Sequence, residues 1–479
     1  MNFKDIRFGY ASAETEGARD PQLLKEGYFD LNGASDQALN GQKFLFLGYK
    51  GSGKSAIGER IRITCEPKYN FFVKQVVLAD FPFSLFSKII RGDSDPEAKY
   101  PTAWSWILLI YLLESFAKDE GASHHNPHSL PEVVNALGKM GLCPAKDASS
   151  IVRISSKANF KLTIPSVFEG SFGIGDLRPA SEIPSFVESL KILACGVKTN
   201  NRHYVVIDGL DDILTKKGTQ YTSIGYLIYE VDRLNNMLYA HNVPAKIILL
   251  CRTDIFERVD GANKNKVRQD SSVDINWYHD TRKPENSALI SAANLRARVS
   301  LCQDVDIFRD FITSNIDGQD QRTYLLDMTR HTPRDFLQLL KCIQDFSEPH
   351  KKISSDCVKG GMRKYSIEYF LPEIRDELVG YTNPEEGDAI FDIISAIKKR
   401  DFTYEEAVTV ANKVAPDMAE KRVYAVFKAM FECGAIGNVQ HTPGGTTHFT
   451  FKYRNRQSVF KKNERLILHK ELWKALNLI

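Results

Sequence analysis

The chain has 479 residues and a formal net charge of +3, with 43% hydrophobic and 26% charged residues. Its length exceeds one ordinary hydrophobic core and predicts about two to four domains. The composition excludes a largely disordered chain, and the small net charge by itself gives no argument for a polyanionic partner.

No segment of the sequence has the character of a membrane span. The first 20 residues lack the apolar core of a signal peptide, and the longest apolar run, WILLIYLL at residues 106–113, is too short to cross a bilayer. We expect this run to form a buried helix. The eight cysteines stand singly, without a C-x-x-C pair or a histidine at zinc spacing. These features predict reduced thiols, a cytoplasmic location and no membrane contact.

Residues 44–62, FLFLGYKGSGKSAIGERIR, pass from an apolar strand through three glycines into a helical pattern. Ordered glycine costs entropy, so glycines here indicate that the backbone itself contacts a ligand. The run fits G-x-x-x-x-G-K-[ST], the pattern of a phosphate-binding loop at a helix N-terminus. A glycine-rich turn that binds nothing is the alternative. The residues predicted to bind nucleotide are Gly48, Tyr49, Lys50, Gly51, Ser52, Gly53, Lys54, Ser55 and Ala56.

Two side chains of this loop have predicted chemical roles. Lys54 is expected to neutralise the β- and γ-phosphate oxygens of ATP, and Ser55 to bind Mg²⁺. Successive backbone N–H groups around the helix start favour an anion at this position.

A second predicted strand lies in HYVVIDGLDDIL, residues 203–214, and ends at Asp208. Downstream of a phosphate loop this is the Walker B pattern, in which the carboxylate holds Mg²⁺ through water. Asp211 and Asp212 lie on the turn beyond the strand, where an acid can orient the attacking water. We predict Asp212 for that task, with Asp211 as the alternative and a helix cap as the third reading.

A third predicted strand, residues 247–250, is followed by Arg252. Ligands of parallel sheets collect at the carboxyl ends of strands, so we expect Arg252 beside the γ-phosphate. The alternative is an arginine paired with Asp254 or Glu257. Residues 272–279 are predicted to flank the sheet, and helical patterns separate the strands, for example at 183–194 and 221–239. The fold class is therefore α/β with a parallel sheet.

The core resembles the STAND branch of AAA+-like P-loop ATPases. The similar features are YVVIDGLDD at residues 204–212, which has that branch's hhhhDGLDD form, and a strand ending in Arg252. Residues 274–279 and 287–301 look like the branch's final strand and first lid helix. AAA+ proteins usually have Glu directly after the Walker B Asp, whereas this chain has Gly209, which implies a slow switch rather than rapid hydrolysis.

Further segments extend the resemblance. TRHTPRDFLQLLKCI, residues 329–343, resembles the sensor-2 region of STAND and origin-recognition ATPases, which implies that Pro333 opens a helix and Arg334 points toward the nucleotide. The opening FGYASAETE and the closing ILHKELWKALNL are similar to a poorly characterised bacterial P-loop ATPase family. We expect residues 1–40 to contribute to the nucleotide site.

The predicted domains are an ATPase core at 41–285 with a helical and β insert at 81–180, a helical lid at 286–375, and a winged-helix-like domain at 385–479. The last domain is expected from helical patterns at 389–398, 404–414 and 417–433, followed by β-rich runs around Pro443-Gly444-Gly445.

Cations after residue 450 are candidates for contacting DNA phosphates. They include Lys452, Arg454, Arg456, Lys461 and Lys462. The alternative is a solvated face on a domain that folds back on the nucleotide or binds a protein.

The sequence as a whole predicts an ATP-binding, slowly hydrolysing switch that regulates a protein partner or a homo-oligomer. In an oligomer, Arg258, Lys266 or Arg268 is expected to enter a neighbour's site. A DNA-binding ATPase resembling origin-recognition loaders is the alternative function. A role in bacterial defence is a further possibility that rests on the STAND resemblance.

Overall fold

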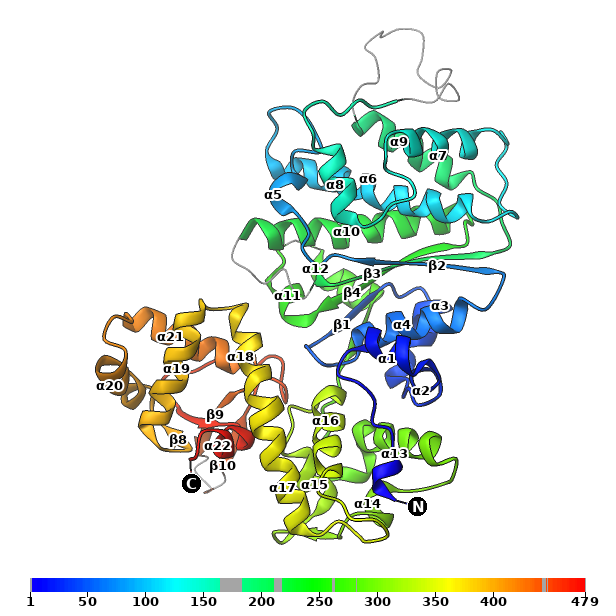
Figure 1. Cartoon of the computed structure of the whole chain (residues 1–479). Helices are drawn as coiled ribbons and strands as arrows, with labels where there is room; N and C mark the ends of the chain where they lie inside the picture. The colour runs from blue at the N-terminus through cyan, green and yellow to red at the C-terminus, as the bar shows by residue number, and fades with distance from the viewer. Residues whose placement is uncertain are drawn as a thin grey trace.

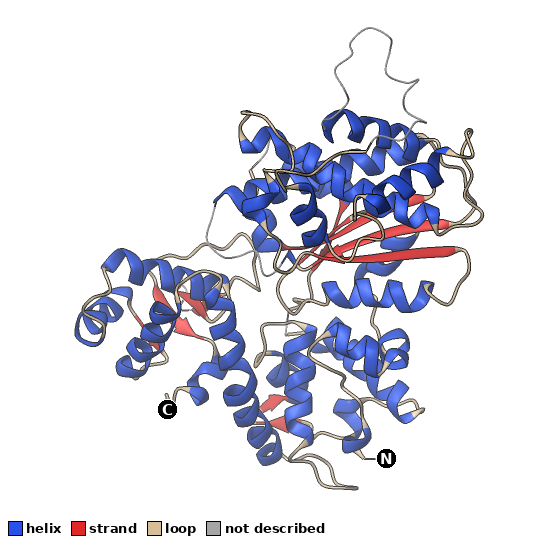
Figure 2. Ribbon diagram, turned by 45° about the horizontal axis from the view of Figure 1, so that its top comes forward, coloured by secondary structure: helices blue, strands red, loops and turns tan. Residues whose placement is uncertain are grey.

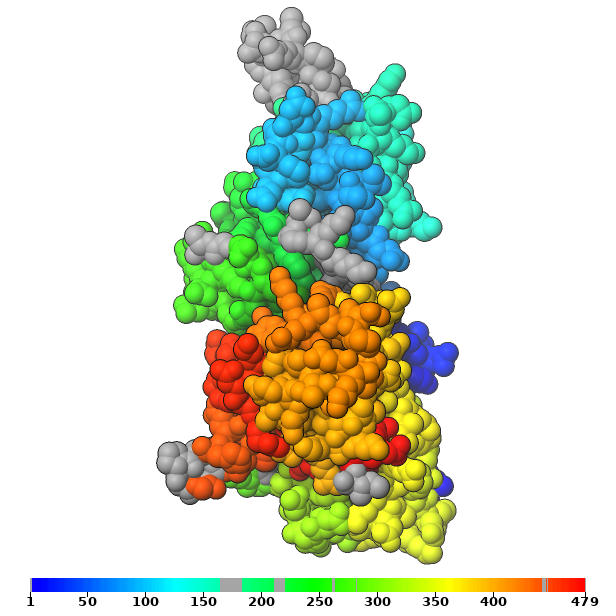
Figure 3. All heavy atoms as spheres, turned by 90° about the vertical axis from the view of Figure 1, so that its left-hand side faces the viewer, coloured from blue at the N-terminus to red at the C-terminus, as the bar shows by residue number. Residues whose placement is uncertain are grey.

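The computed structural model describes residues 2–163, 183–210, 218–260, 263–280, 282–441, 445 and 447–478. Figure 1 shows the core above, the lid at lower right and a C-terminal module at lower left. We use "lid" for residues 286–375, "linker" for 376–384 and "C-terminal module" for 385–478. Figure 3 shows the C-terminal module, in orange and red, packed against the core and the lid.

The core is built on a five-stranded parallel sheet of order β2-β3-β4-β1-β5. Gly48 of β1 is in register with Arg252 of β4 and Ile275 of β5, so the carboxyl ends of these strands are level. The predicted α/β class with a parallel sheet is confirmed. The strands are β1 (Leu45–Gly48), β2 (Phe71–Val77), β3 (Arg202–Asp208), β4 (Ala245–Arg252) and β5 (Ser272–Ile275).

Edge strand β2 was not predicted, although FFVKQVV is rich in the β-branched and aromatic residues of strands. The flanking strand expected at 272–279 is present but ends at Ile275.

Alternate residues of the central strands face two separate hydrophobic clusters, as the period of a β-strand requires. Leu45 and Leu47 pack with the helices of the insert, whereas Phe46 between them packs in the cluster that includes the lid and the C-terminal module. Figure 2 shows helices on both faces of the sheet. The helices are α1 (Ala13–Arg19), α2 (Pro21–Glu26), α3 (Ala34–Leu39), α4 (Lys54–Cys65), α5 (Phe83–Phe86), α6 (Pro96–Ala117), α7 (Ser129–Lys139), α8 (Ala148–Ser155), α9 (Ile183–Cys195), α10 (Gly218–Ala240), α11 (Thr253–Arg258) and α12 (Lys264–Ser271).

The insert is helical where it is described. The run at 106–113 lies in α6 and is buried, as expected, and the predicted helices at 183–194 and 221–239 are confirmed by α9 and α10. The sequence also predicted β structure in the insert, in the stretch that begins at residue 157. Residues 157–163 form no strand, and residues 164–182 lie outside the described residues. Among the helices that the structure describes, none is long and apolar enough to cross a membrane.

The lid is mainly helical and leads into the C-terminal module through one long, nearly continuous helix. That helix contains a π-helical turn, Ser366–Phe370 (η6). The other lid elements are α13 (Ala288–Leu301), α14 (Ile307–Asp310), β6 (Asn315–Ile316), β7 (Gln319–Asp320), α15 (Gln321–Leu326), α16 (Pro333–Gln344), α17 (Ser355–Tyr365) and α18 (Leu371–Val379).

The C-terminal module has the expected three helices and hairpin, with Pro443 and Gly444 of the turn outside the described residues. Its first helix begins earlier than predicted, because Asn383 and Glu386 form a capping box. An antiparallel sheet of order β10-β9-β11-β8 joins them; the winged-helix assignment stays a prediction. The elements are α19 (Pro384–Ile397), β8 (Asp401–Phe402), α20 (Tyr404–Val414), α21 (Glu420–Glu432), β9 (Ile436–His441), β10 (Thr447–Thr450), β11 (Arg465–Leu468) and α22 (Lys470–Ala475).

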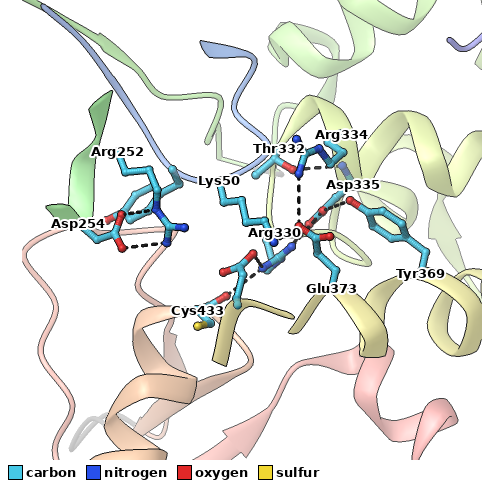
Figure 4. Close-up of polar contacts among 12 residues, drawn as sticks. Lys50, Arg252, Asp254, Arg330, Thr332, Arg334, Asp335, Tyr369, Glu373 and Cys433 are labelled. Atoms are coloured by element: carbon cyan, nitrogen blue, oxygen red, sulfur yellow. Dashed lines mark hydrogen bonds and ion pairs between the residues drawn. The ribbon is translucent and has the colours of Figure 1, made fainter. Parts of the chain in front are cut away.

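Arg330, just before α16, joins the lid, the linker and the C-terminal module (Figure 4). Its guanidinium donates to Asp335 at 2.9 Å, to Glu377 at 2.6 Å and to the carbonyl of Cys433 at 3.2 Å. Tyr369 donates a further hydrogen bond of 3.0 Å to Asp335. All of these side chains except Tyr369, which is partly exposed, are buried, so Arg330 compensates two buried carboxylates at once.

We expect Arg330→Met to lower the free energy of unfolding by about 3–5 kcal/mol, because it leaves buried Asp335 and Glu377 without their cation. Denaturant titration followed by intrinsic tryptophan fluorescence, to which Trp473 in α22 contributes, measures this. Arg282→Met is the matched control, since the Arg282 ion pair with Asp280 is exposed, and it should leave unfolding unchanged. Equal effects of both variants would contradict the structural role.

Candidate nucleotide site

The loop between β1 and α4 has the conformation that its glycines predict. Gly53 has φ +92°, a left-handed value that side chains rarely adopt, and it immediately precedes the first helical residue, Lys54. The N-terminal N–H groups of α4 therefore border the loop, where an anion is favoured.

Lys54 is 4% exposed and lies inside the curve of this loop. Its ammonium group donates to the carbonyl oxygens of Gly48 at 3.2 Å and of Tyr49 at 3.1 Å. These two acceptors are neutral, so a phosphate oxygen would be a stronger partner for the ammonium group than either of them.

A cavity of about 210 Å³ opens from the loop. Lys54 and Ser55 are among its polar lining residues, and Tyr28, Phe29 and Trp277 supply aromatic surface. The Trp277 indole donates to the carbonyl of Ser52 at 2.8 Å, which ties the aromatic wall to the loop. A polar anion site continuous with aromatic walls suits a nucleoside phosphate.

The N-terminal segment forms one wall of this cavity, and a buried ion pair fastens it to the lid. Its contribution to a nucleotide site stays a prediction. Arg296 of α13 donates to Glu16 of α1 at 2.9 and 2.7 Å and to the carbonyl of Phe8 at 2.8 Å. Tyr10, which lines the cavity, donates its backbone N–H to Glu16 at 2.9 Å. The shape of the cavity therefore depends on where the lid stands.

Asp208 closes β3, the neighbour of β4 in the sheet. Its carboxylate accepts a 2.7 Å hydrogen bond from the N–H of Gly209. Gly209 has φ +81°, and a β-carbon there would lie 2.9 Å from Val77 Cγ1 and 3.0 Å from the Leu78 nitrogen. The backbone at this point thus excludes a glutamate. Asp211 and Asp212 lie outside the described residues. The assignment of Asp212, or alternatively Asp211, as the acid that orients the attacking water therefore stays a prediction.

Arg252, at the end of β4, forms a buried bidentate ion pair with Asp254, which was one of the two readings of the sequence. Both hydrogen bonds are 2.9 Å long. Burial opposes ionisation of Asp254, but the charge of Arg252 and the hydrogen bonds it donates hold the carboxyl pKa below its ordinary value. Contact of Arg252 with a γ-phosphate stays a prediction, and it requires exchange of this carboxylate.

The first turn of lid helix α16 rests on the phosphate loop (Figure 4). Thr332 caps the helix and Pro333 is its first residue, as the sequence indicated. The Arg334 backbone N–H donates to the carbonyl of Gly51 at 3.3 Å, and its side chain lines the cavity. Glu373 of α18 lies 3.0 Å from Lys50 and 3.4 Å from Arg334.

The C-terminal module also reaches the loop. A domain that folds back on the nucleotide was one alternative from the sequence, but the residue that makes the contact was not identified there. The Arg456 guanidinium lies 5.7 Å from the centre of the Tyr49 ring and forms a 2.6 Å ion pair with Asp274 of β5. Burial, opposed by the charge of Arg456, raises the pKa of the Tyr49 hydroxyl. Two consecutive loop residues, Tyr49 and Lys50, therefore contact two different modules.

Most of the cations proposed for DNA are held in ion pairs. Arg454 lies 3.6 Å from Asp327 of the lid, Lys452 lies 3.5 Å from Glu432, and Lys461 lies 2.9 Å from Glu464. Lys462 is exposed.

Three basic residues were predicted to enter a neighbour's site in an oligomer, and two of them have partners within the chain. Arg258 donates to the Tyr221 hydroxyl at 2.7 Å, and Arg268 contacts Glu257 and Asp274. The third, Lys266, lines a separate groove. Insertion into a neighbour's site therefore requires Arg258 and Arg268 to leave these contacts, and stays a prediction.

The parallel sheet, the glycine loop and the helix that starts at its lysine form a P-loop fold. A family model described as the FunZ-associated C-terminal helical domain matches residues 287–371. These residues span the lid from the start of α13 to the start of α18. No protein with a curated description matches the chain.

Three solved structures show distant similarity. The Aeropyrum pernix ORC1 protein in complex with DNA has a TM-score of 0.39 and 12% identity, over 98% of this chain and 93% of that one. Cdc6p from Pyrobaculum aerophilum has a TM-score of 0.30 and 12% identity, over 93% of this chain and 92% of that one. The Drosophila ORC bound to DNA has a TM-score of 0.28 and 11% identity, over 98% of each chain.

We expect Lys54→Ala to weaken ATP binding roughly 10- to 150-fold, the worth of a charged hydrogen bond at the phosphates. Isothermal calorimetry with Mg·ATP measures this. Lys43→Ala is the control, because Lys43 donates to the carbonyls of Gln269 and Asp270, outside the phosphate loop. Unchanged affinity in Lys54→Ala would contradict the assignment of the loop.

Proposed function

We propose that the protein is an ATP-binding, slowly hydrolysing switch in which the bound nucleotide sets the positions of the lid and the C-terminal module. One observation carries this proposal: the residues of the phosphate loop are themselves contacted by both modules. Lys50 contacts the lid through Glu373, and Tyr49 contacts the C-terminal module through Arg456.

The coupling follows from the position of Lys54. It is bonded to the carbonyls of Gly48 and Tyr49, and ATP phosphates would draw the ammonium away from them. The peptide of Tyr49 would then lose an internal partner next to its contact with Arg456. A nucleotide shifts such an equilibrium only if it contacts the two arrangements differently. Loss of these loop contacts provides that difference.

Ser55 and Asp208 have the oxygen donors that Mg²⁺ prefers, at the helix start and at the end of β3. When bound, Mg²⁺ would offset phosphate charge between them. Asp208 would act through water, and its carboxylate is oriented for this by the N–H of Gly209.

Slow hydrolysis is supported by the backbone at Gly209. The glutamate that AAA+ proteins usually carry after the Walker B aspartate has no room here, so another acid must orient water. Asp212, with Asp211 as the alternative, remains our assignment for that acid. A slow chemical step suits a switch, because each nucleotide state then persists.

A DNA-binding ATPase is the second candidate. It is favoured by exposed lysines on helix α21, Lys421 and Lys428, and by Lys462. Against it, Arg454 and Arg456 form ion pairs with the lid and the core. A protein partner or a second copy of the chain therefore fits the switch better, and a role in bacterial defence rests on the STAND resemblance alone.

We expect Arg456→Gln to uncouple the C-terminal module while sparing the phosphate site. ATP affinity should stay within about threefold of the unaltered chain, since the lost contact is a partly screened charge pair. In the unaltered chain we expect ATP to change the hydrogen exchange of β9 and β11, and in Arg456→Gln this change should disappear. Arg422→Gln is the matched control, because Arg422 of α21 pairs with Glu386 of α19 inside the module and outside the two strands that are measured. An unchanged exchange response in Arg456→Gln would contradict the proposed route.

Duplex DNA binding at two salt concentrations separates the two functions. The switch predicts negligible affinity at physiological salt. A DNA-binding protein that contacts 6–10 phosphates should instead lose roughly 10³–10⁵ in affinity between 50 and 200 mM salt. In that case Lys421→Gln with Lys428→Gln should reduce both the affinity and its salt slope.

A further inference from the structure

The linker carries one aromatic residue, Tyr381, that is held by the core. Its hydroxyl donates to Asp254 at 2.7 Å, and the Arg258 guanidinium lies 4.8 Å from the centre of its ring. Arg258 is fixed in turn by the Tyr221 hydroxyl at 2.7 Å. Residues Asp254, Arg258 and Tyr221 thus form a site on the core that holds a residue of the linker.

The position of Tyr381 is set by the turn that joins the lid to the C-terminal module. Its N–H donates to the carbonyl of Leu378 at 2.8 Å, and α19 begins at Pro384. Rotation of the C-terminal module relative to the core would therefore move Tyr381 with it.

Asp254 also fixes the position of the Arg252 guanidinium. Its two oxygens accept both hydrogen bonds of the Arg252 fork, and one of them also accepts from Tyr381. Arg252 is 4% exposed and Asp254 8%, so their ion pair is shielded from water. Arg252 lines a small cavity of about 40 Å³ together with Tyr49 and Ser52 of the phosphate loop. The arginine is next to the loop, but its bidentate face is occupied.

We propose that Tyr381 is a positioning residue that keeps Arg252 bound to Asp254 while the C-terminal module is docked. An ion pair is strongest in a dry, low-dielectric setting and weakens when water reaches it. Withdrawal of Tyr381 removes one hydrogen bond from Asp254 and opens the pair to water. Arg252 is then released to bind the γ-phosphate, which ATP has and ADP lacks. This inference rests on the proposed switch function. It predicts that the preference for ATP over ADP depends on Tyr381 of the linker.

The test is Tyr381→Phe, which keeps the ring beside Arg258 and removes only the hydroxyl. The measured quantity is the ratio of the ADP and ATP dissociation constants from calorimetry. We expect the preference for ATP to rise roughly threefold to tenfold, the worth of one buried hydrogen bond. Tyr239→Phe, at a tyrosine that is 70% exposed on α10, is the matched control and should leave the ratio unchanged.

A double-mutant cycle with Arg252→Lys separates this role from a general packing effect, because lysine keeps the charge but cannot bind in two places. In the Arg252→Lys background, Tyr381→Phe should no longer change the ratio. We call this role of Tyr381, which keeps Arg252 bound to Asp254, the latch. The same change of the ratio in both backgrounds, or no change in either, would overturn the latch. Asp254→Asn provides a second variant that loosens Arg252, and it should shift the ratio in the same direction as Tyr381→Phe.

Failure of the latch is distinguishable from failure of the switch. If the unaltered chain binds no ATP, or if Lys54→Ala binds it equally well, the proposed function fails together with the latch. If binding depends on Lys54 but the ratio ignores Tyr381, only the latch fails.

Discussion

Arg330 is 6% exposed and donates to groups from the lid, the linker and the C-terminal module. A buried cation is tolerated only when carboxylates and carbonyls surround it, and each of its carboxylates is equally dependent on the cation. The same requirement applies to Arg296 with Glu16 and to Arg252 with Asp254. The pairs of Arg330 and Arg296 decide which surfaces of the modules can meet, because a shifted interface would leave a buried charge alone.

An interface fixed by ion pairs also suits the proposed switch, in which an arginine would exchange a carboxylate for a phosphate. A phosphate group is a better match than a carboxylate for an arginine fork, so an incoming nucleotide can compete for an existing pair. Apolar contacts have no such competitor. In the proposed switch, the apolar cluster that includes the lid and the C-terminal module would supply cohesion, whereas the arginines near the loop would supply sensitivity to phosphate.

The parts of the site that depend on local sequence could be predicted. The loop from Gly48 to Ser55 follows from its glycines, and the ends of β3 and β4 follow from apolar runs closed by polar residues. Contacts such as that of Arg456 with Tyr49 join residues hundreds of positions apart, and no local pattern encodes them. The cations after residue 450 show the limit: a charge run reveals its sign but not whether acids such as Asp327 and Asp274 will meet it. Pairing of Arg252 with Asp254 was foreseeable because the two are neighbours.

The division of strand residues between two clusters has a mechanical consequence. Leu45 and Leu47 hold the sheet to the insert helices through a cluster in which none of the described residues belongs to the lid or the C-terminal module. In the proposed switch, movement of those modules would act first on the opposite cluster, to which Phe46 belongs. The insert face would then be the side of the molecule that moves least. A partner anchored there would feel displacement of the C-terminal module as a change of distance, with the sheet as the fixed reference.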